Sequence, residues 1–403
     1  MLFVQPVDIL GYSDIELIEF LQKINSVEPY CLSIVDTFGS MYSEDLERVF
    51  ELIHHNLIPT CRIGFHSHNN LQMSNALSQQ FLRMTYGKRD VVVDGTIAGM
   101  GRGAGNTPTE LIAQYMVDKM HYSYDIDALL DIIDDYIDNI RTRCTWGYTT
   151  PYFIAGCFGA HVNNVTYLTK KNSLRSKDIR YILNKIGTIP RKRYYYDLLE
   201  ETYMEYVASD IDDTGSIDRL RDVLSGKNIL IVAPGSSVCT QKVKISEYIR
   251  NNDAITISIN GIFDGIGSTF IYISNAKRYV SSGRSLSMTG IPMIITSNID
   301  NKYNAEFVIS FKRLIKCGWI HMDNSGLMLL RLLDMMNVKS IAIAGLDGYC
   351  YSDNYAKNEL AFANTDEDPI KLNEEIQSML IDYMETKVSS CSIKFITDTR
   401  FKL

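Results

Sequence analysis

The sequence predicts an α/β protein in which parallel strands alternate with helices in two separate regions. Short apolar runs and amphipathic helical patterns alternate from the first residue to about residue 120, and again from residue 226 to the end. The stretch between them has mainly helical patterns. A chain of 403 residues suits two or three domains. We therefore expect three segments: a strand–helix region at 1–120, a helical extension and linker at 121–225, and a second strand–helix region at 226–403.

Each element of the first region has a local signal. Strand-like runs occupy 2–9, 32–36, 61–66 and 91–97, and helical patterns occupy 13–25, a stretch from Ser43, 71–85 and a stretch from Thr107. Ser13 is expected to cap the first helix. The second helix should bury one face, which carries Leu46, Val49, Phe50 and Ile53. Pro108 falls in the first turn of the fourth helix, where proline is tolerated.

The spacing of these units favours a barrel. Buried parallel strands with crossover helices form either a doubly wound sheet or a (β/α)8 barrel. A barrel uses roughly 30 residues per unit, and the four units here fill about 120 residues. Four units make only half of a barrel. We therefore expect a half-barrel whose other half is either lost from this chain or supplied by a second chain.

The third region predicts a doubly wound, Rossmann-like sheet. Its strand-like runs lie at 229–232, 254–260, 269–274, 292–296, 307–310, 340–345 and 393–397. The first run is followed by a short turn that contains Gly235, Ser236 and Ser237. A dinucleotide-binding fingerprint has three glycines where this turn has one. We leave open whether these three residues bind a phosphate or form a tight turn between a strand and a helix.

The composition excludes several classes of protein. Hydrophobic residues make up 46% and charged residues 22%, which is typical of a soluble globular chain. A net charge of −8 argues against nucleic acid as the main partner. We find no apolar run long enough to span a membrane and no signal-peptide pattern at the N-terminus. The eight cysteines include no CxxC pair, so we expect reduced thiols and a cytoplasmic location.

Two histidines at the end of the third strand are candidate metal ligands. His66 and His68 are two residues apart, and alternate residues of a strand point to the same face. Two imidazoles with oxygen ligands suit Mn²⁺, Fe²⁺, Co²⁺ or Zn²⁺. The alternative is two polar residues at the start of a loop. After the fourth strand, Gly103, Gly105 and Asn106 lie in a glycine-rich loop, which either approaches a ligand closely or is a flexible turn.

Three motifs together resemble a known family. They are VDTFGSMYSEDL at 35–46, GFHSHNNL at 64–71 and VDGTIAGMGRGAGNTPTELI at 93–112. In this order and spacing they resemble the 4-hydroxy-2-oxovalerate aldolases, which belong with HMG-CoA lyase and isopropylmalate synthase in one group of metal-dependent TIM-barrel enzymes. The resemblance covers 1–120 and, more loosely, 121–190. The synthase branch usually has HNDxG where this sequence has HNNL, which favours the aldolase branch.

The resemblance implies roles for particular residues. His66 and His68 look like the two histidine ligands of a divalent metal, usually Mn²⁺. Asn106 resembles a further ligand of the HMG-CoA lyase branch, and in the aldolase branch we expect it to line the substrate pocket with the loop glycines. Tyr148 resembles a tyrosine that reaches back over the substrate. Asp36 ends its strand and either faces this pocket or caps a loop.

The resemblance also shows what this sequence does not contain. The family carries an Arg-Asp pair on its first barrel strand, with Asp as the third metal ligand and Arg beside the enolate oxygen. No such pair lies upstream of His66. The resemblance therefore implies the C-terminal half of the barrel, with the N-terminal half missing.

Three functions follow as hypotheses. The first is a metal-dependent aldolase that cleaves a 4-hydroxy-2-oxo acid to pyruvate and an aldehyde, with an aldehyde dehydrogenase partner or a homo-oligomer as the implied assembly. The second is an inactive half-barrel whose chain functions through nucleotide or nucleotide-sugar binding in the C-terminal region. The third is an acyl-CoA-dependent synthase of 2-oxo acids, which HNNL disfavours.

Overall fold

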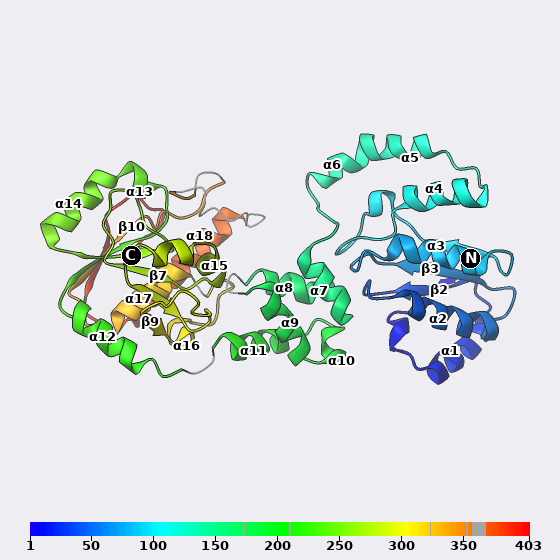
Figure 1. Cartoon of the computed structure of the whole chain (residues 1–403), viewed down its shortest axis with the longest axis horizontal. Coiled ribbons are helices and arrows are strands. Elements are labelled where there is room, and N and C mark those ends of the chain that lie inside the picture. Colours follow the sequence, from blue (N-terminus) through cyan, green and yellow to red (C-terminus); the bar gives the residue numbers. More distant parts are fainter. Residues whose placement is uncertain (172–173, 209–210, 323, 352–353, 357–367) are drawn as a thin grey trace. The chain divides into compact units, whose positions relative to one another are not determined.

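The computed structural model describes residues 1–171, 174–208, 211–322, 324–351, 354–356 and 368–403. The chain forms two compact units (Figure 1). The first comprises Met1–Thr169 and Ser176–Glu200, and the second comprises Lys170–Arg175 and Glu201–Leu403. Each unit contains one parallel sheet, which confirms the α/β class. The three segments expected at 1–120, 121–225 and 226–403 stay a prediction.

The sheet of the first unit has four parallel strands in the order β1-β2-β3-β4. The strands are β1 (Phe3–Val4), β2 (Cys31–Asp36), β3 (Arg62–Ser67) and β4 (Val91–Val93). The helices that follow them are α1 (Asp14–Val27), α2 (Ser43–Asn56), α3 (Ser74–Thr85) and α4 (Thr109–Met120), with 3-10 turns η1 (Ile9–Gly11) and η2 (Ile97–Gly99). This repeat matches the predicted succession of elements. The half-barrel itself stays a prediction.

The first strand is shorter than the predicted run of 2–9. It ends at Val4, and the chain turns into η1 at Ile9. Pro6 has no N–H group to continue a strand ladder, and Asp8 adopts a left-handed backbone conformation with φ of 57°. An apolar run alone did not reveal this early stop.

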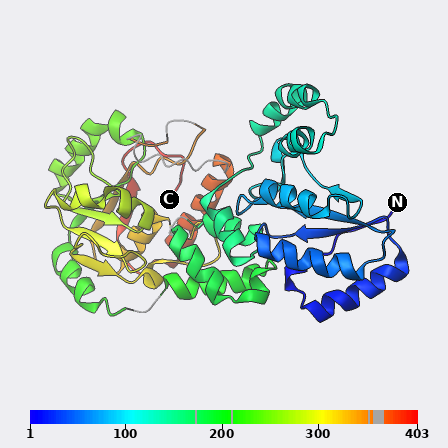
Figure 2. The same cartoon turned by 45° about the vertical axis from the view of Figure 1, so that its right-hand side comes forward.

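The core of the first unit forms where one face of the sheet meets helices α1, α2 and α3 (Figures 1 and 2). Leu32 and Ile34 of β2 and Ile63 and Phe65 of β3 belong to this core. So do the predicted helix residues Leu46, Val49, Phe50 and Ile53, all fully buried. Ser13 caps α1 as predicted: its hydroxyl accepts from the Glu16 N–H, and the Glu16 carboxylate accepts from the Ser13 N–H. The opposite face is therefore left for residues such as Ser33, Gly64 and His66, which share that face by register.

Helices dominate the chain between the two sheets. They are α5 (Ile126–Ile132), a π-helical stretch (Ile133–Ile137), α6 (Asp138–Arg141), α7 (Thr150–Phe158), α8 (Val162–Thr169), α9 (Ser176–Lys185), α10 (Thr188–Arg191), α11 (Tyr196–Val207) and α12 (Thr214–Leu224). Among the described residues, none of the chain's helices combines the length and hydropathy of a membrane span.

The second unit contains a seven-stranded parallel sheet in the order β11-β10-β5-β6-β7-β8-β9. Its strands are β5 (Asn228–Val232), β6 (Ile255–Ile259), β7 (Phe270–Ile273), β8 (Met293–Thr296), β9 (Phe307–Ile309), β10 (Ser340–Ala344) and β11 (Ser392–Phe395). Its helices are α13 (Ser237–Thr240), α14 (Lys242–Asn252), α15 (Ala276–Ser287), α16 (Phe311–Leu314), α17 (Ser325–Asp334) and α18 (Pro369–Thr386). All seven predicted strands are present. The strand order reverses between β5 and β10. From β5 the chain adds β6 to β9 on one side of the sheet, and then β10 and β11 on the other side of β5.

Candidate metal and substrate site

The two predicted histidines lie side by side at the carboxyl end of β3. His66 is in the strand and His68 directly follows it, and their ring centroids are 5.2 Å apart. The Nδ1 atom of His66 lies 3.1 Å from Oδ2 of Asp94, and the same carboxylate oxygen accepts a hydrogen bond of 2.8 Å from Gln5. A carboxylate on one ring nitrogen fixes the tautomer and directs the other nitrogen to a metal. Nε2 of His66 is therefore the nitrogen offered to a ligand.

His68 is held in the neutral form that binds metals. Burial, then the neighbouring His66, then Arg102, lower the pKa of His68 to about 4. A neutral imidazole is the form that coordinates a divalent cation. The donor set thus fits such a cation, with two imidazoles as protein ligands. Within the described ranges, no cluster of three or more His, Cys, Asp or Glu side chains is arranged to hold a metal ion.

The glycine-rich loop is fastened against the segment that follows His68. Asn69 donates its N–H to the Gly105 carbonyl at 2.8 Å, and Ala104 donates its N–H to Oδ1 of Asn70 at 3.0 Å. A β-bridge pairs His68 with Asn106. The amide oxygen of Asn106 is buried without a hydrogen-bond partner among the described residues. A buried, unsatisfied oxygen beside a histidine pair is a feature that a bound cation or substrate would satisfy.

Gly103 and Gly105 are required by the backbone of this loop. Both have positive φ, of 65° and 88°. A Cβ atom on Gly105 would lie 2.0 Å from the carbonyl oxygen of Gly99. These glycines thus serve the packing of the loop on itself, and the predicted close approach of the loop to a ligand stays a prediction.

Asp36 has the contacts of a loop cap. Its side chain is 2% exposed, and Oδ1 accepts from the N–H groups of Ser40 at 2.8 Å and Met41 at 3.3 Å. These contacts favour the capping role over the catalytic role that the sequence left open. Burial raises the pKa of Asp36 to about 6, and the two N–H groups oppose that rise.

This raised pKa predicts a pH-dependent stability. Asp36 holds its proton more tightly in the folded than in the unfolded chain, so it stabilises the fold at low pH, and this contribution is lost as the pH rises from about 4 to about 6. Relative to Asp36→Asn, the parent should lose up to about 3 kcal/mol of unfolding free energy over this interval. Urea titrations of both proteins at pH 4.5, 5.5 and 6.5 measure it. If the unfolding free energy of the parent minus that of Asp36→Asn stays constant or increases with pH, the assignment is contradicted.

Tyr148 is not brought to the site by any described contact. Its side chain is 59% exposed, on the segment between α6 and α7. Its proposed place over the substrate therefore has no support from the geometry and stays a prediction of the resemblance.

The turn after β5 is closed by a carboxylate of the same unit. Asp347 accepts from the Ser237 N–H at 2.7 Å and from the Ser237 hydroxyl, and Gly235 donates its N–H to the Gly345 carbonyl at 2.8 Å. The amide and hydroxyl of Ser237 that would bind a phosphate are thus already used. These contacts favour the tight turn for Gly235, Ser236 and Ser237, the second of the two alternatives that the sequence left open.

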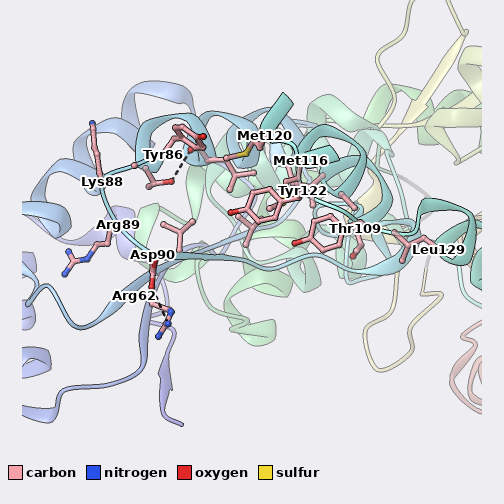
Figure 3. A pocket seen from close by; sticks show the side chains of 18 of the residues that line it. Arg62, Tyr86, Lys88, Arg89, Asp90, Thr109, Met116, Met120, Tyr122 and Leu129 are labelled. Atoms are coloured by element: carbon pink, nitrogen blue, oxygen red, sulfur yellow. Dashed lines mark hydrogen bonds and ion pairs between the residues drawn. The ribbon is translucent and has the colours of Figure 1, made fainter. Parts of the chain in front are cut away.

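A cavity of about 850 Å³ lies in the first unit, away from the histidines. Its apolar lining comes from Leu82, Val91, Val93, Ile112, Met116 and Met120. Figure 3 shows Arg62 and Asp90 at one end and Leu129 at the other. Arg62 and Asp90 stand at the beginnings of β3 and β4, whereas the histidines stand at the opposite ends of the strands. This cavity is therefore separate from the histidine site.

Sequence reasoning missed the residues that support the histidines. Asp94 holds His66, and Asn70, 2% exposed, joins two loops by accepting from Ala104 and donating to the Phe38 carbonyl at 2.9 Å. A signal for Asp94 was present: Phe65 pairs with Val93 in parallel register, so the residues that follow each of them share a face. No comparable local signal marks Asn70.

Comparison with known proteins places these motifs in a family. Residues 4–135 match the sequence model of the HMGL-like family. The 4-hydroxy-2-oxovalerate aldolase of Pseudoalteromonas translucida is 28% identical over 199 residues, covering 46% of this chain and 54% of that protein. The enzyme of the same name from Pseudomonas putida is 25% identical over 197 residues, covering 46% and 53%. The chain thus spans about half the length of the curated relatives that it matches.

A solved structure overlaps the chain more loosely. It is the N-terminal domain of a protein described as an aldolase, from Bacteroides vulgatus, with 24% identity, a TM-score of 0.37, and coverage of 42% of this chain and 53% of that one. So low a score adds nothing to the fold described above. The family match and the named relatives confirm the resemblance that the motifs indicate. Over residues 4–135 the chain is similar to the HMGL-like family.

Proposed function

We propose that residues 4–135 form an HMGL-like domain, which carries the metal site of an aldolase that cleaves a 4-hydroxy-2-oxo acid to pyruvate and an aldehyde. The observation that carries the proposal is the pairing of His66 with His68 at the carboxyl end of β3, with Asp94 on Nδ1 of His66. Catalytic residues of parallel-strand barrels gather at this end of the strands. The relatives named as 4-hydroxy-2-oxovalerate aldolases support the substrate class.

The chain's own residues have distinct tasks in this proposal. His66 and His68 would hold the cation, for which the resemblance implies Mn²⁺. A divalent cation at this place supplies Lewis-acid stabilisation of the negative charge that develops on the 2-oxo group. Asp94 keeps His66 in one tautomer and orientation. Burial keeps His68 neutral at pH 7, so no proton competes for its ring nitrogen.

The proposed reaction is a retro-aldol cleavage. A base takes the proton of the 4-hydroxyl group, and the C3–C4 bond breaks with release of the aldehyde. The electron pair of that bond moves into the enolate of pyruvate, and a proton returned to C3 completes the product. Since the family's Arg-Asp pair does not occur upstream of His66, we expect the rate to increase when a segment that carries this pair is supplied.

Pyruvate release tests the proposal. With 4-hydroxy-2-oxopentanoate and Mn²⁺, we expect pyruvate to form, as followed by NADH consumption with lactate dehydrogenase, and to stop on chelation or in His66→Ala. Pyruvate formation that is unchanged by chelation, or none above the His66→Ala background even with the Arg-Asp segment added, would contradict it. Dependence on acetyl-CoA would favour the synthase hypothesis instead. The aldehyde dehydrogenase partner, the homo-oligomer and the cytoplasmic location stay predictions.

A second candidate function is a nucleotide or nucleotide-sugar site in the second unit. The reversal of strand order between β5 and β10 favours it, because open parallel sheets bind ligands at such a point. Arg278 lies in α15, which follows β7; it is 8% exposed, and its guanidinium lies 5.4 Å from the ring of Tyr355. Calorimetry with nucleotides and nucleotide sugars tests this candidate, and flat titrations would count against it.

A further inference from the structure

The glycine-rich loop brings one arginine to the edge of the histidine pair. Arg102 begins a tight turn, since its carbonyl accepts from the Gly105 N–H at 3.0 Å. The turn is docked on the residues just after His68, through the bond from Ala104 to Asn70 and the bond from Asn69 to Gly105. The C-terminal end of the turn that Arg102 begins is therefore held against the segment just after His68.

The glycines beside Arg102 are closely packed, with no free space where a side chain would begin. A Cβ atom on Gly101 would lie 2.7 Å from the amide nitrogen of Asn106, and one on Gly103 would lie 2.8 Å from Oδ1 of Asn70. The same atom on Gly103 would lie 3.0 Å from Val162, at the start of α8. The turn thus fits between the histidine segment and a helix of the same unit.

The charge of Arg102 acts on two imidazoles. It contributes, after burial, to lowering the pKa of His161, and it contributes to lowering the pKa of His68 after burial and His66. The Arg102 side chain is exposed, and no hydrogen bond or ion pair joins it to another side chain in the part of the chain that the structure describes. The guanidinium of Arg102 is thus left exposed on a loop that is bonded to the segment carrying the proposed metal ligands.

We propose that Arg102 binds the carboxylate of the 2-oxo acid substrate beside His66 and His68. This inference rests on the proposed function. The planar guanidinium offers two parallel N–H groups to a carboxylate, a geometry that a lysine cannot reproduce. An arginine at this position favours 2-oxo acids over neutral 2-oxo compounds, so Arg102 is a substrate-binding and specificity-determining residue.

Pyruvate binding tests the proposal with and without the metal. Calorimetric titrations of pyruvate are made on the full chain, both metal-free and with Mn²⁺. In Arg102→Ala the pyruvate affinity should fall about ten- to hundredfold in both states, and Arg102→Lys should recover part of it. Pyruvamide, the neutral analogue, should bind the parent and Arg102→Ala equally. Arg143→Ala, which removes another exposed arginine of the first unit, should bind pyruvate as the parent does.

The outcomes separate this inference from the proposed function. The Mn²⁺ affinity of Arg102→Ala should remain within about twofold of the parent, because Arg102 is not a ligand. Failure of the parent to bind Mn²⁺ would overturn the proposed metal site, and the metal-free titrations would still decide the role of Arg102. The inference itself is overturned if the parent does not bind pyruvate in either state, or if Arg102→Ala binds pyruvate as tightly as the parent.

Discussion

Replacing His68 with alanine is expected to weaken Mn²⁺ binding by about a hundredfold or more. Loss of a residue that only orients a ligand already costs roughly 10- to 100-fold in metal affinity, and loss of the ligand itself should cost more. His68 supplies one of the two imidazoles, 5.2 Å from the other between ring centroids. The amplitude of the free Mn²⁺ EPR signal, measured during a titration at pH 7.5, gives the Mn²⁺ affinity of the parent and that of His68→Ala.

Two further variants make this result specific. His55→Ala removes an exposed histidine of α2 that pairs with Glu51 at 3.2 Å, and it should bind Mn²⁺ as the parent does. Asp94→Asn should weaken binding by roughly 10- to 100-fold, because it disturbs only the support of His66. If His68→Ala binds as tightly as the parent, the metal lies elsewhere and the proposed function loses the observation that carries it.

Substitution of Gly105 by alanine is expected to destabilise the first unit by about 2–6 kcal/mol. The new Cβ atom would lie 2.0 Å from the Gly99 carbonyl oxygen, so the loop would have to move. The strained backbone of a non-glycine residue at a φ of 88° lowers the unfolding free energy by roughly 1–3 kcal/mol, and overpacking lowers it by a similar amount. Because Asn69 and His68 are bonded to this loop, the Mn²⁺ affinity should fall as well.

Gly87 offers a matched control for the part of this effect that comes from backbone strain alone. Its φ is 69°, but a Cβ atom there would meet nothing within 4 Å. Gly87→Ala should therefore cost only about 1–2 kcal/mol. The chain has two tryptophans, so Trp319→Phe leaves Trp146, whose Nε1 donates to Ala98 near the loop, as a fluorescent reporter of the first unit. Equal denaturation midpoints for the two alanine variants would show that the loop is not packed as described.

The succession of elements could be predicted because each one has a local cause. In α2, the four predicted apolar residues are spaced to lie on one face, and all four are buried. Several strands of the second unit, such as β7 and β8, are short, mainly apolar and fully buried, as parallel strands inside a sheet are. The prediction failed for the first strand, where Pro6 and the left-handed Asp8 end the pairing. The end of this strand is thus set by the backbone conformation of these residues and not by the number of apolar residues in the run.

The site could be predicted only where its residues are close in sequence. His66 and His68 follow from the two-residue period of a strand. Asp94 is 28 residues away from His66, and the carboxylate that closes the Ser237 turn is 110 residues away. Such pairs depend on strand order and register, which a single sequence does not encode locally. For Asp36, the sequence placed the residue at a strand end, and the bonds to Ser40 and Met41, which favour capping, depend on the path of the loop that follows.

The most direct test of the account is the nitrogen coupling of Mn²⁺ bound to the purified chain. Electron spin-echo envelope modulation of one equivalent of Mn²⁺ should show ¹⁴N coupling from imidazole, and the coupling should vanish in the double variant His66→Ala, His68→Ala. It should persist in His55→Ala. Bound Mn²⁺ without ¹⁴N coupling, or the same coupling in the double variant, would contradict the assignment of this histidine pair as the metal site.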